Sequence, residues 1–152
     1  MPDIALYQPD IPQNTGTILR LGACMGVHVH IIEPCGFALS DHSLKRAGMD
    51  YVERSALEKH LNWDAFELWR ETAKRRLIVL STKAEVTYTD FSFDPNDLLL
   101  FGRESSGVPQ YVHDRADVRL TIPMAPGLRS LNIAVSAGMA LGEALRQTHT
   151  FP

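Results

Sequence analysis

Short, almost purely apolar segments constrain the fold of this chain more than any other sequence feature. Two of them, "LIVLST" at 77–82 and "DLLLFG" at 97–102, lack the alternation of apolar and polar residues that marks a half-exposed strand. Strands that are apolar along their whole length are typical of sheets covered by helices on both faces, and such sheets are mostly parallel. The sequence therefore predicts an α/β fold.

Segments with helical spacing alternate with the predicted strands. "DIALYQP" near the start, "VHVHIIEP" at 27–34 and "VRLTIP" at 118–123 have strand composition. Helical patterns are found in "NTGTILRLGACMG" at 14–26, "SDHSLKRAG" at 40–48, "WDAFELWRETAKRR" at 63–76 and the segment that follows residue 130. This alternation predicts a single domain over residues 1–152, built on a mostly parallel sheet flanked by helices.

Length and charge set limits on the function. The chain has 152 residues, 45% of them hydrophobic, which suits one globular domain with its own core. No signal peptide and no segment of transmembrane length is recognisable, so we expect a cytoplasmic protein without a membrane partner. No Cys/His/carboxylate cluster has metal-like spacing, and we expect no metal. A net charge of −3 means that any nucleic acid would need a local basic surface.

Three polar loops follow predicted strands: "YQPDIPQNTG" at 7–16, "FGRESSGVP" at 101–109 and "PMAPGLRS" at 123–130. In open α/β sheets, ligands bind beyond the carboxyl ends of the strands, so the loops are candidate sites. The second loop lacks both the GxxxxGK[ST] and the GxGxxG spacing of phosphate-binding loops. It can place Ser105, Ser106 and Gly107 at a helix N-terminus facing a ligand, or it can be a plain strand-to-helix turn.

Each polar residue of the other two loops also has an ordinary structural interpretation. Asn14 or Thr15 can be a helix N-cap, and so can Ser130. Arg20 either extends into solvent or meets an anion. Asn132 disfavours a helix interior unless its amide has a partner. Beyond it, the small residues Ala134, Gly138 and Gly142 recur at four-residue spacing, which predicts close packing against another backbone.

Taken together and in this order, the three loops resemble the three motifs of the SPOUT superfamily of RNA methyltransferases. The resemblance is strongest to its small single-domain branch, the tRNA wobble-nucleotide 2′-O-methyltransferases. It runs through "LYQPDIPQNTGTILRL", "HIIEPCGF", "LKRAGMDY", "LLLFGRESSGVP" and "IPMAPGLRSLN". Each fragment alone is weak, whereas the order and spacing of all five are specific.

The resemblance implies an α/β fold with a C-terminal deep trefoil knot, a homodimer and S-adenosylmethionine bound in the knot. The residues that match the family's cofactor positions are Leu80, Gly102, Ile122 and Ser130. The residues that match its catalytic positions are Asn14, Arg20, Glu104 and Asn132. Arg20 would reach the neighbouring subunit's site, bind the substrate phosphate and help to activate the ribose hydroxyl.

The implied substrate is the wobble cytidine or uridine of leucine tRNAs. A basic surface for the RNA would be supplied by Lys45, Arg46, Arg54, Arg103 and Arg129. Two positions depart from the family pattern, since Val135 and Gly142 stand where relatives often carry asparagine and tyrosine. A ribose methyltransferase for another tRNA or ribosomal site, and a noncatalytic RNA-binding dimer, are the alternatives.

Overall fold

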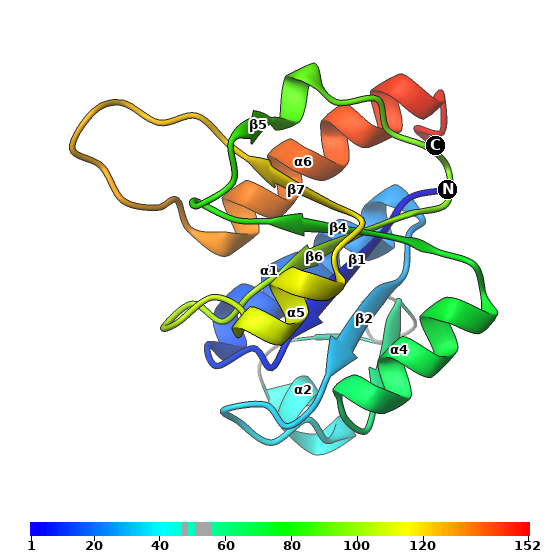
Figure 1. Cartoon of the computed structure of the whole chain (residues 1–152). Helices are drawn as coiled ribbons and strands as arrows, with labels where there is room; N and C mark the ends of the chain where they lie inside the picture. Colours follow the sequence, from blue (N-terminus) through cyan, green and yellow to red (C-terminus); the bar gives the residue numbers. More distant parts are fainter. Residues whose placement is uncertain (47–48, 51–55) are drawn as a thin grey trace.

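The computed structural model of the chain describes residues 1–46, 49–50 and 56–152 (Figure 1). Its elements in chain order are β1 (Asp3–Tyr7), α1 (Pro12–Met25), β2 (Val29–Ile32), α2 (Asp41–Arg46), β3 (Leu57–His60), α4 (Trp63–Thr72), β4 (Arg76–Leu80), β5 (Val86–Thr87), a 3-10 turn (Tyr88–Asp90), β6 (Asp97–Phe101), α5 (Gln110–Arg115), β7 (Val118–Thr121) and α6 (Ile133–Thr148).

The strands form one seven-stranded sheet in the order β3-β2-β1-β6-β4-β7-β5. Every pairing between these strands is parallel. The predicted α/β class and mostly parallel sheet are thus confirmed. Because all strands run in the same direction, the loops after β1, β6, β4 and β7 all leave the sheet at the carboxyl ends of the strands.

Helices cover both faces of the sheet, so the strands are buried on both sides. α1 and α6 pack on one face, and α4 and α5 on the other (Figure 1). Successive residues of one strand contribute to different cores: Ile78 packs with the α1/α6 side, whereas Leu77 and Val79 pack with the α4/α5 side. This double burial is the physical reason for the continuous apolar runs of the sequence.

Two predicted helix boundaries are wrong. α1 begins at Pro12 with Ile11 as its N-cap residue, so neither Asn14 nor Thr15 caps it. Proline is favoured at the first helical position because its missing N–H would have no partner there. The helix predicted over 63–76 ends at Thr72.

Arg76 lies in β4 rather than at a helix C-terminus. Its Nε lies 2.5 Å from Oδ1 of Asp97, a residue with 0% exposure at the start of β6. Arg76 and Asp97 are register partners in the β4–β6 ladder. A buried carboxylate needs a charged or hydrogen-bonded partner, and this pairing outweighs the local helical pattern.

Three short elements escaped the sequence interpretation. β3 has the polar sequence "LEKH" and lies at an edge of the sheet, where two of its side chains are exposed. β5 has two residues and α5 has six, too few for a periodic pattern. In the described part of the chain, no helix has the length and apolar character needed to cross a bilayer.

Candidate active site

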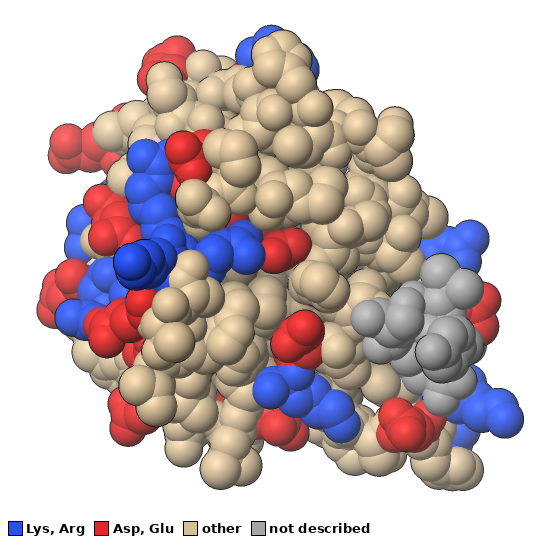
Figure 2. Space-filling model, turned by 90° about the vertical axis from the view of Figure 1, so that its right-hand side faces the viewer, with Lys and Arg blue, Asp and Glu red and all other residues tan. Residues whose placement is uncertain are grey.

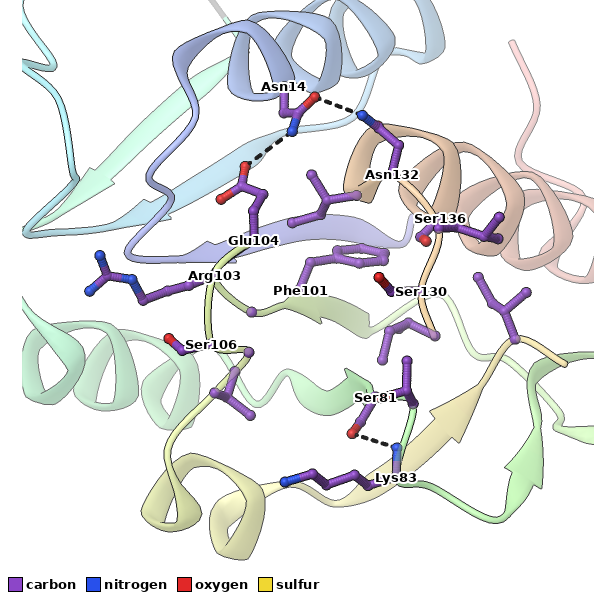
Figure 3. Close-up of a pocket in the computed structure, with 18 of the residues that line it drawn as sticks. Asn14, Ser81, Lys83, Phe101, Arg103, Glu104, Ser106, Ser130, Asn132 and Ser136 are labelled. Atoms are coloured by element: carbon purple, nitrogen blue, oxygen red, sulfur yellow. Dashed lines mark hydrogen bonds between the residues drawn. The ribbon is translucent and has the colours of Figure 1, made fainter. Parts of the chain in front are cut away.

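A cavity of about 520 Å³ opens at the carboxyl edge of the sheet (Figure 3). Its lining comes from the segment after β4, the loop after β6, the segment between β7 and α6, and the first turn of α1. β6, β4 and β7 are adjacent and parallel. The segments that follow these strands are remote in sequence, but they therefore lie side by side at the same end of the sheet. The cavity lies where the sequence predicted a ligand site.

The cavity gathers seven of the eight residues that the sequence singled out. They are Asn14, Leu80, Gly102, Glu104, Ile122, Ser130 and Asn132. The eighth, Arg20, is exposed on α1 and is not part of the cavity lining. The structure thus brings the predicted cofactor residues and three of the four predicted catalytic residues to one place. Their roles remain predictions.

A chain of polar side chains forms one rim of the cavity. Asn14 Nδ2 donates to Glu104 Oε1 at 3.5 Å, and Asn132 Nδ2 donates to Asn14 Oδ1 at 3.0 Å (Figure 3). Asn132 is also the N-cap of α6, because its Oδ1 accepts from the backbone N–H of Ala134 at 2.8 Å. The ordinary interpretation of Ser130 as this cap is therefore wrong. One asparagine both starts α6 and extends the rim.

Gly102 sits where the backbone folds back on itself. A Cβ atom at this position would lie 2.4 Å from the carbonyl carbon of Gly107 and 2.8 Å from the Val108 nitrogen. Arg103 and Gly107 close the turn with two backbone hydrogen bonds of 2.9 and 2.8 Å. The sequence had suggested that residues 105–107 open a helix. They do not, since α5 begins only at Gln110. The tight turn replaces the predicted helix N-terminus.

An acidic pair lies behind the rim. Asp10, in the loop after β1, exchanges hydrogen bonds with Glu104. Hydrogen bonds from Glu104 and Ser105 lower the pKa of Asp10, whereas burial and the neighbouring Asp10 raise the pKa of Glu104. Asp10 is the important residue that the sequence interpretation missed. Its only sequence signal is its place in the first polar loop.

The opposite side of the cavity carries basic and hydroxyl groups. Ser81 and Lys83 lie across from the Glu104 rim, and the Ser81 hydroxyl accepts from the Lys83 backbone N–H at 3.2 Å (Figure 3). His113 also lines this side, and its pKa is lowered by burial and then by the charges of Arg119 and Lys83. The cavity thus carries Glu104 and Arg103 on one side and Lys83 on the other. Among the described residues, no group of three or more His, Cys, Asp or Glu could hold a metal ion.

The two glycines of the small-residue stripe of α6 meet no neighbour within the described chain. A Cβ at Gly138 or Gly142 would meet no atom within 4 Å. The face of α6 that packs on the sheet is a different one, and it consists of Ala137, Ala140, Leu141, Ala144 and Leu145. Gly138 and Gly142 therefore lie on a side of α6 against which the described chain does not pack, whereas Ala134 contacts the core.

Comparison with known protein families identifies the fold. The model of the SpoU rRNA Methylase family matches residues 2–142. The chain belongs to the SpoU methylase family. This family is part of the superfamily whose three motifs the sequence resembles, so that expectation is confirmed.

Three relatives connect the family to a reaction. The tRNA (cytidine(34)-2′-O)-methyltransferase of Beijerinckia indica subsp. indica is 60% identical over 95% of this chain and 90% of its own length. A structure solved to explain 2′-OH methylation of C/U34 on tRNA is 42% identical, with a TM-score of 0.88 over 97% of this chain and 95% of the other. An AdoMet-bound rRNA methyltransferase from Sinorhizobium meliloti is 26% identical, with a TM-score of 0.83 over 95% of this chain and 56% of the other.

Proposed function

We propose that this protein transfers the methyl group of S-adenosylmethionine to the 2′-hydroxyl of the wobble nucleotide, cytidine or uridine, of leucine tRNAs. One observation carries the proposal: seven residues from separate segments of the chain, all of which match the family's cofactor or catalytic positions, line one cavity. The similarity to tRNA 2′-O-methyltransferases over nearly the whole chain supports it.

The cavity fits S-adenosylmethionine in size and chemistry. Its volume of about 520 Å³ lies within the usual range for small-molecule sites. Leu80, Phe101 and Ile122 supply apolar surface for a flat ring, and Gly102 lets backbone amides come close to a ligand. The hydroxyl of Ser130 adds a polar partner. When bound, the cofactor supplies an electrophilic methyl group on a sulfonium.

The polar row on the cavity rim would position the ribose of the substrate for in-line attack on the methyl group. Asn14, Glu104 and Asn132 form a hydrogen-bonded row, so each side chain is held in one orientation. A fixed row of donors and acceptors can align a hydroxyl with the methyl group, and alignment supplies much of the rate enhancement in such reactions. Arg20 contributes a positive charge for an RNA phosphate beside the developing oxyanion.

The homodimer is proposed from the uncovered face of α6. Val135 and Met139, one turn apart on α6, have exposures of 51 and 39%, and Leu128 and Leu131, in the segment before α6, have exposures of 70 and 39%. A row of exposed apolar side chains beside the small residues Gly138 and Gly142 is suited to close helix packing. A second copy of the chain on this face would bring Arg20, which lies on the adjacent α1, toward its cavity.

The knot and the domain organisation belong to the same proposal. Ile122, Met124, residues 130–133 and Ser136 line the cavity together with residues 80–83 and the loop after β6, which agrees with a C-terminal segment that threads through that loop. We infer that residues 1–152 act as one methyltransferase domain in the cytoplasm, where tRNA is processed.

The RNA surface is proposed around the cavity mouth. The face in Figure 2 lies on the other side of the molecule, at the right of Figure 1, and there Lys and Arg side chains lie beside Asp and Glu side chains rather than in a patch of one sign. Arg70 and Arg115 both pair with Glu67, and they also pair with Asp117 and Glu71 respectively, so neither has its charge free for a phosphate. Lys45, Arg46, Arg103 and Arg129 are the described candidates for phosphate contacts, as the sequence predicted, and Arg103 also lies 3.7 Å from Asp10. Arg54, predicted with them, lies outside the described residues.

Methyl transfer to tRNA tests the proposal. The protein is incubated with labelled S-adenosylmethionine and total tRNA from a strain that lacks it, and the label is mapped by nuclease digestion. We expect label in a 2′-O-methylated wobble pyrimidine of leucine tRNA. Label in another tRNA or in ribosomal RNA would contradict the substrate, and absence of both transfer and cofactor binding by calorimetry would favour a noncatalytic RNA-binding dimer.

A further inference from the structure

Two loops at the active site are joined by a reciprocal pair of hydrogen bonds. The backbone N–H of Asp10 donates to Glu104 Oε2 at 3.1 Å, and the backbone N–H of Glu104 donates to Asp10 Oδ1 at 3.2 Å. The loops leave the sheet side by side because β1 and β6 are parallel neighbours with Leu6 opposite Phe101. Each carboxyl group thus fixes the backbone that carries the other.

Asp10 is itself held from several directions. The hydroxyl of Ser105 donates to its Oδ2, and Nε of Arg103 lies 3.7 Å from the same oxygen. On the other side its backbone packs on Gly36, where a Cβ would lie 2.8 Å from the Asp10 Cβ. Gly36 also donates its N–H to the Pro9 carbonyl at 2.9 Å. The Asp10 carboxylate therefore has one well-defined position.

The held carboxylate acts on the cavity through Glu104. Asp10 is not among the residues that line the cavity, whereas Glu104, Asn14 and Asn132 are. With Oε2 of Glu104 occupied by the Asp10 N–H, Oε1 faces Asn14 at 3.5 Å, and Asn14 in turn binds Asn132. The orientation of the whole row therefore depends on Asp10.

We propose that Asp10 is a positioning residue for methyl transfer, which holds the Glu104 carboxyl against Asn14 and by its negative charge makes Glu104 the member of the pair that keeps a proton. The proposal rests on the proposed function, because the row is useful only if it aligns a ribose hydroxyl.

The charges around the pair support the proposed distribution of the proton. The charged groups near Glu104 are Asp10 from the loop after β1 and Arg103 from its own loop, and the other polar neighbours, Asn14 and Ser105, are neutral. Two carboxyl groups this close do not ionise independently. Asp10 loses its proton first because the hydrogen bonds of Glu104 and Ser105, together with the charge of Arg103, lower its pKa. After burial, the hydrogen bond and the charge of Asp10 raise the pKa of Glu104.

The test is the Asp10→Asn variant, which keeps the size of the side chain and one oxygen but removes the charge. Carbon-detected NMR of labelled carboxyl groups follows Glu104 as the pH is changed, with Glu104→Gln used to assign its signal. We expect the Glu104 titration to move to lower pH in Asp10→Asn. We also expect kcat for methyl transfer to fall roughly tenfold to a hundredfold, while the affinity for S-adenosylmethionine and the KM for tRNA stay near their wild-type values.

An exposed aspartate supplies the matched control. Asp90→Asn makes the same chemical change in the 3-10 turn, away from the cavity. It should alter neither the Glu104 titration nor kcat for methyl transfer. An unmoved Glu104 titration, or wild-type kcat in Asp10→Asn, would overturn the inference. Failure of the proposed function has a different signature, since the wild-type protein would then methylate no tRNA even though the carboxyl titration still reports on the pair.

Discussion

Replacing Gly102 with alanine should damage both the fold and the cavity. The added Cβ would lie 2.4 Å from the Gly107 carbonyl carbon, 2.7 Å from the Gly107 Cα and 2.8 Å from the Val108 nitrogen, whereas ordinary contacts begin at 3.4 Å. All three atoms belong to the backbone, so no side chain can rotate away. The turn would have to open by about 1 Å, a distance that the Arg103–Gly107 hydrogen bonds cannot absorb without lengthening.

The expected cost follows from two contributions. Overpacking of this kind costs about 1–3 kcal/mol, and each weakened hydrogen bond costs up to about 1 kcal/mol more. A total of about 2–4 kcal/mol corresponds to a decrease in Tm of roughly 5–15 °C for a chain of this length. Because Gly102 lines the cavity, the same displacement should weaken binding of S-adenosylmethionine by at least about tenfold.

Thermal unfolding and calorimetric titration with S-adenosylmethionine measure these two effects. Leu68→Ala is the control, because Leu68 is 69% exposed on α4 and is not among the residues that line the cavity, and exposed substitutions usually change stability by less than about 0.5 kcal/mol. It should leave the protein about as stable as the wild type. Gly102→Ala with wild-type Tm and wild-type affinity would refute the steric reasoning.

Three further predictions concern other parts of the molecule. Burial lowers the pKa of His30 to about 3 against the opposing effect of Asp3, so the unfolded chain takes up a proton below pH 6.5 that the folded chain does not. Between pH 7 and pH 5 the contribution of His30 to the free energy of unfolding should therefore fall by about 2 kcal/mol. Chemical denaturation should show that this loss is absent in His30→Gln, and an equal loss in both proteins would contradict the prediction. Asp97→Asn should destabilise the fold by about 2–3 kcal/mol in the same assay. This is less than for a fully buried ion pair, because Arg76 is 37% exposed. An unchanged stability would mean that the Arg76–Asp97 pair contributes nothing. Val135→Glu should convert a dimer into a folded monomer in analytical ultracentrifugation, since Val135 is 51% exposed in the single chain; a variant that remains dimeric would place the interface elsewhere.

The sheet was predictable because its strands are buried on both faces. Burial leaves a direct trace in the sequence, as in "LIVL" and "DLLLF", where no polar residue interrupts the run. β3 left no such trace, because an edge strand exposes Glu58 and Lys59 to solvent. Helix boundaries were less predictable. α1 starts at Pro12, which has no backbone N–H to satisfy, and not at a polar residue that could cap it.

The candidate site was predictable only as far as its loops match family motifs. Those matches found the residues that line the cavity but not Asp10, whose contacts with Glu104 join positions 94 residues apart in the chain. Pairing of this kind depends on which strands become neighbours, and the order β2-β1-β6-β4 cannot be read from local patterns.

A crystal structure of the protein with S-adenosylhomocysteine, the product of the cofactor, tests the role of the cavity most directly. We expect the ligand between Leu80, Gly102, Ile122 and Ser130, with its sulfur directed toward the Asn14–Glu104–Asn132 row. Density for the ligand in any other pocket, or in this cavity with the sulfur directed away from that row, would contradict the proposed site of methyl transfer.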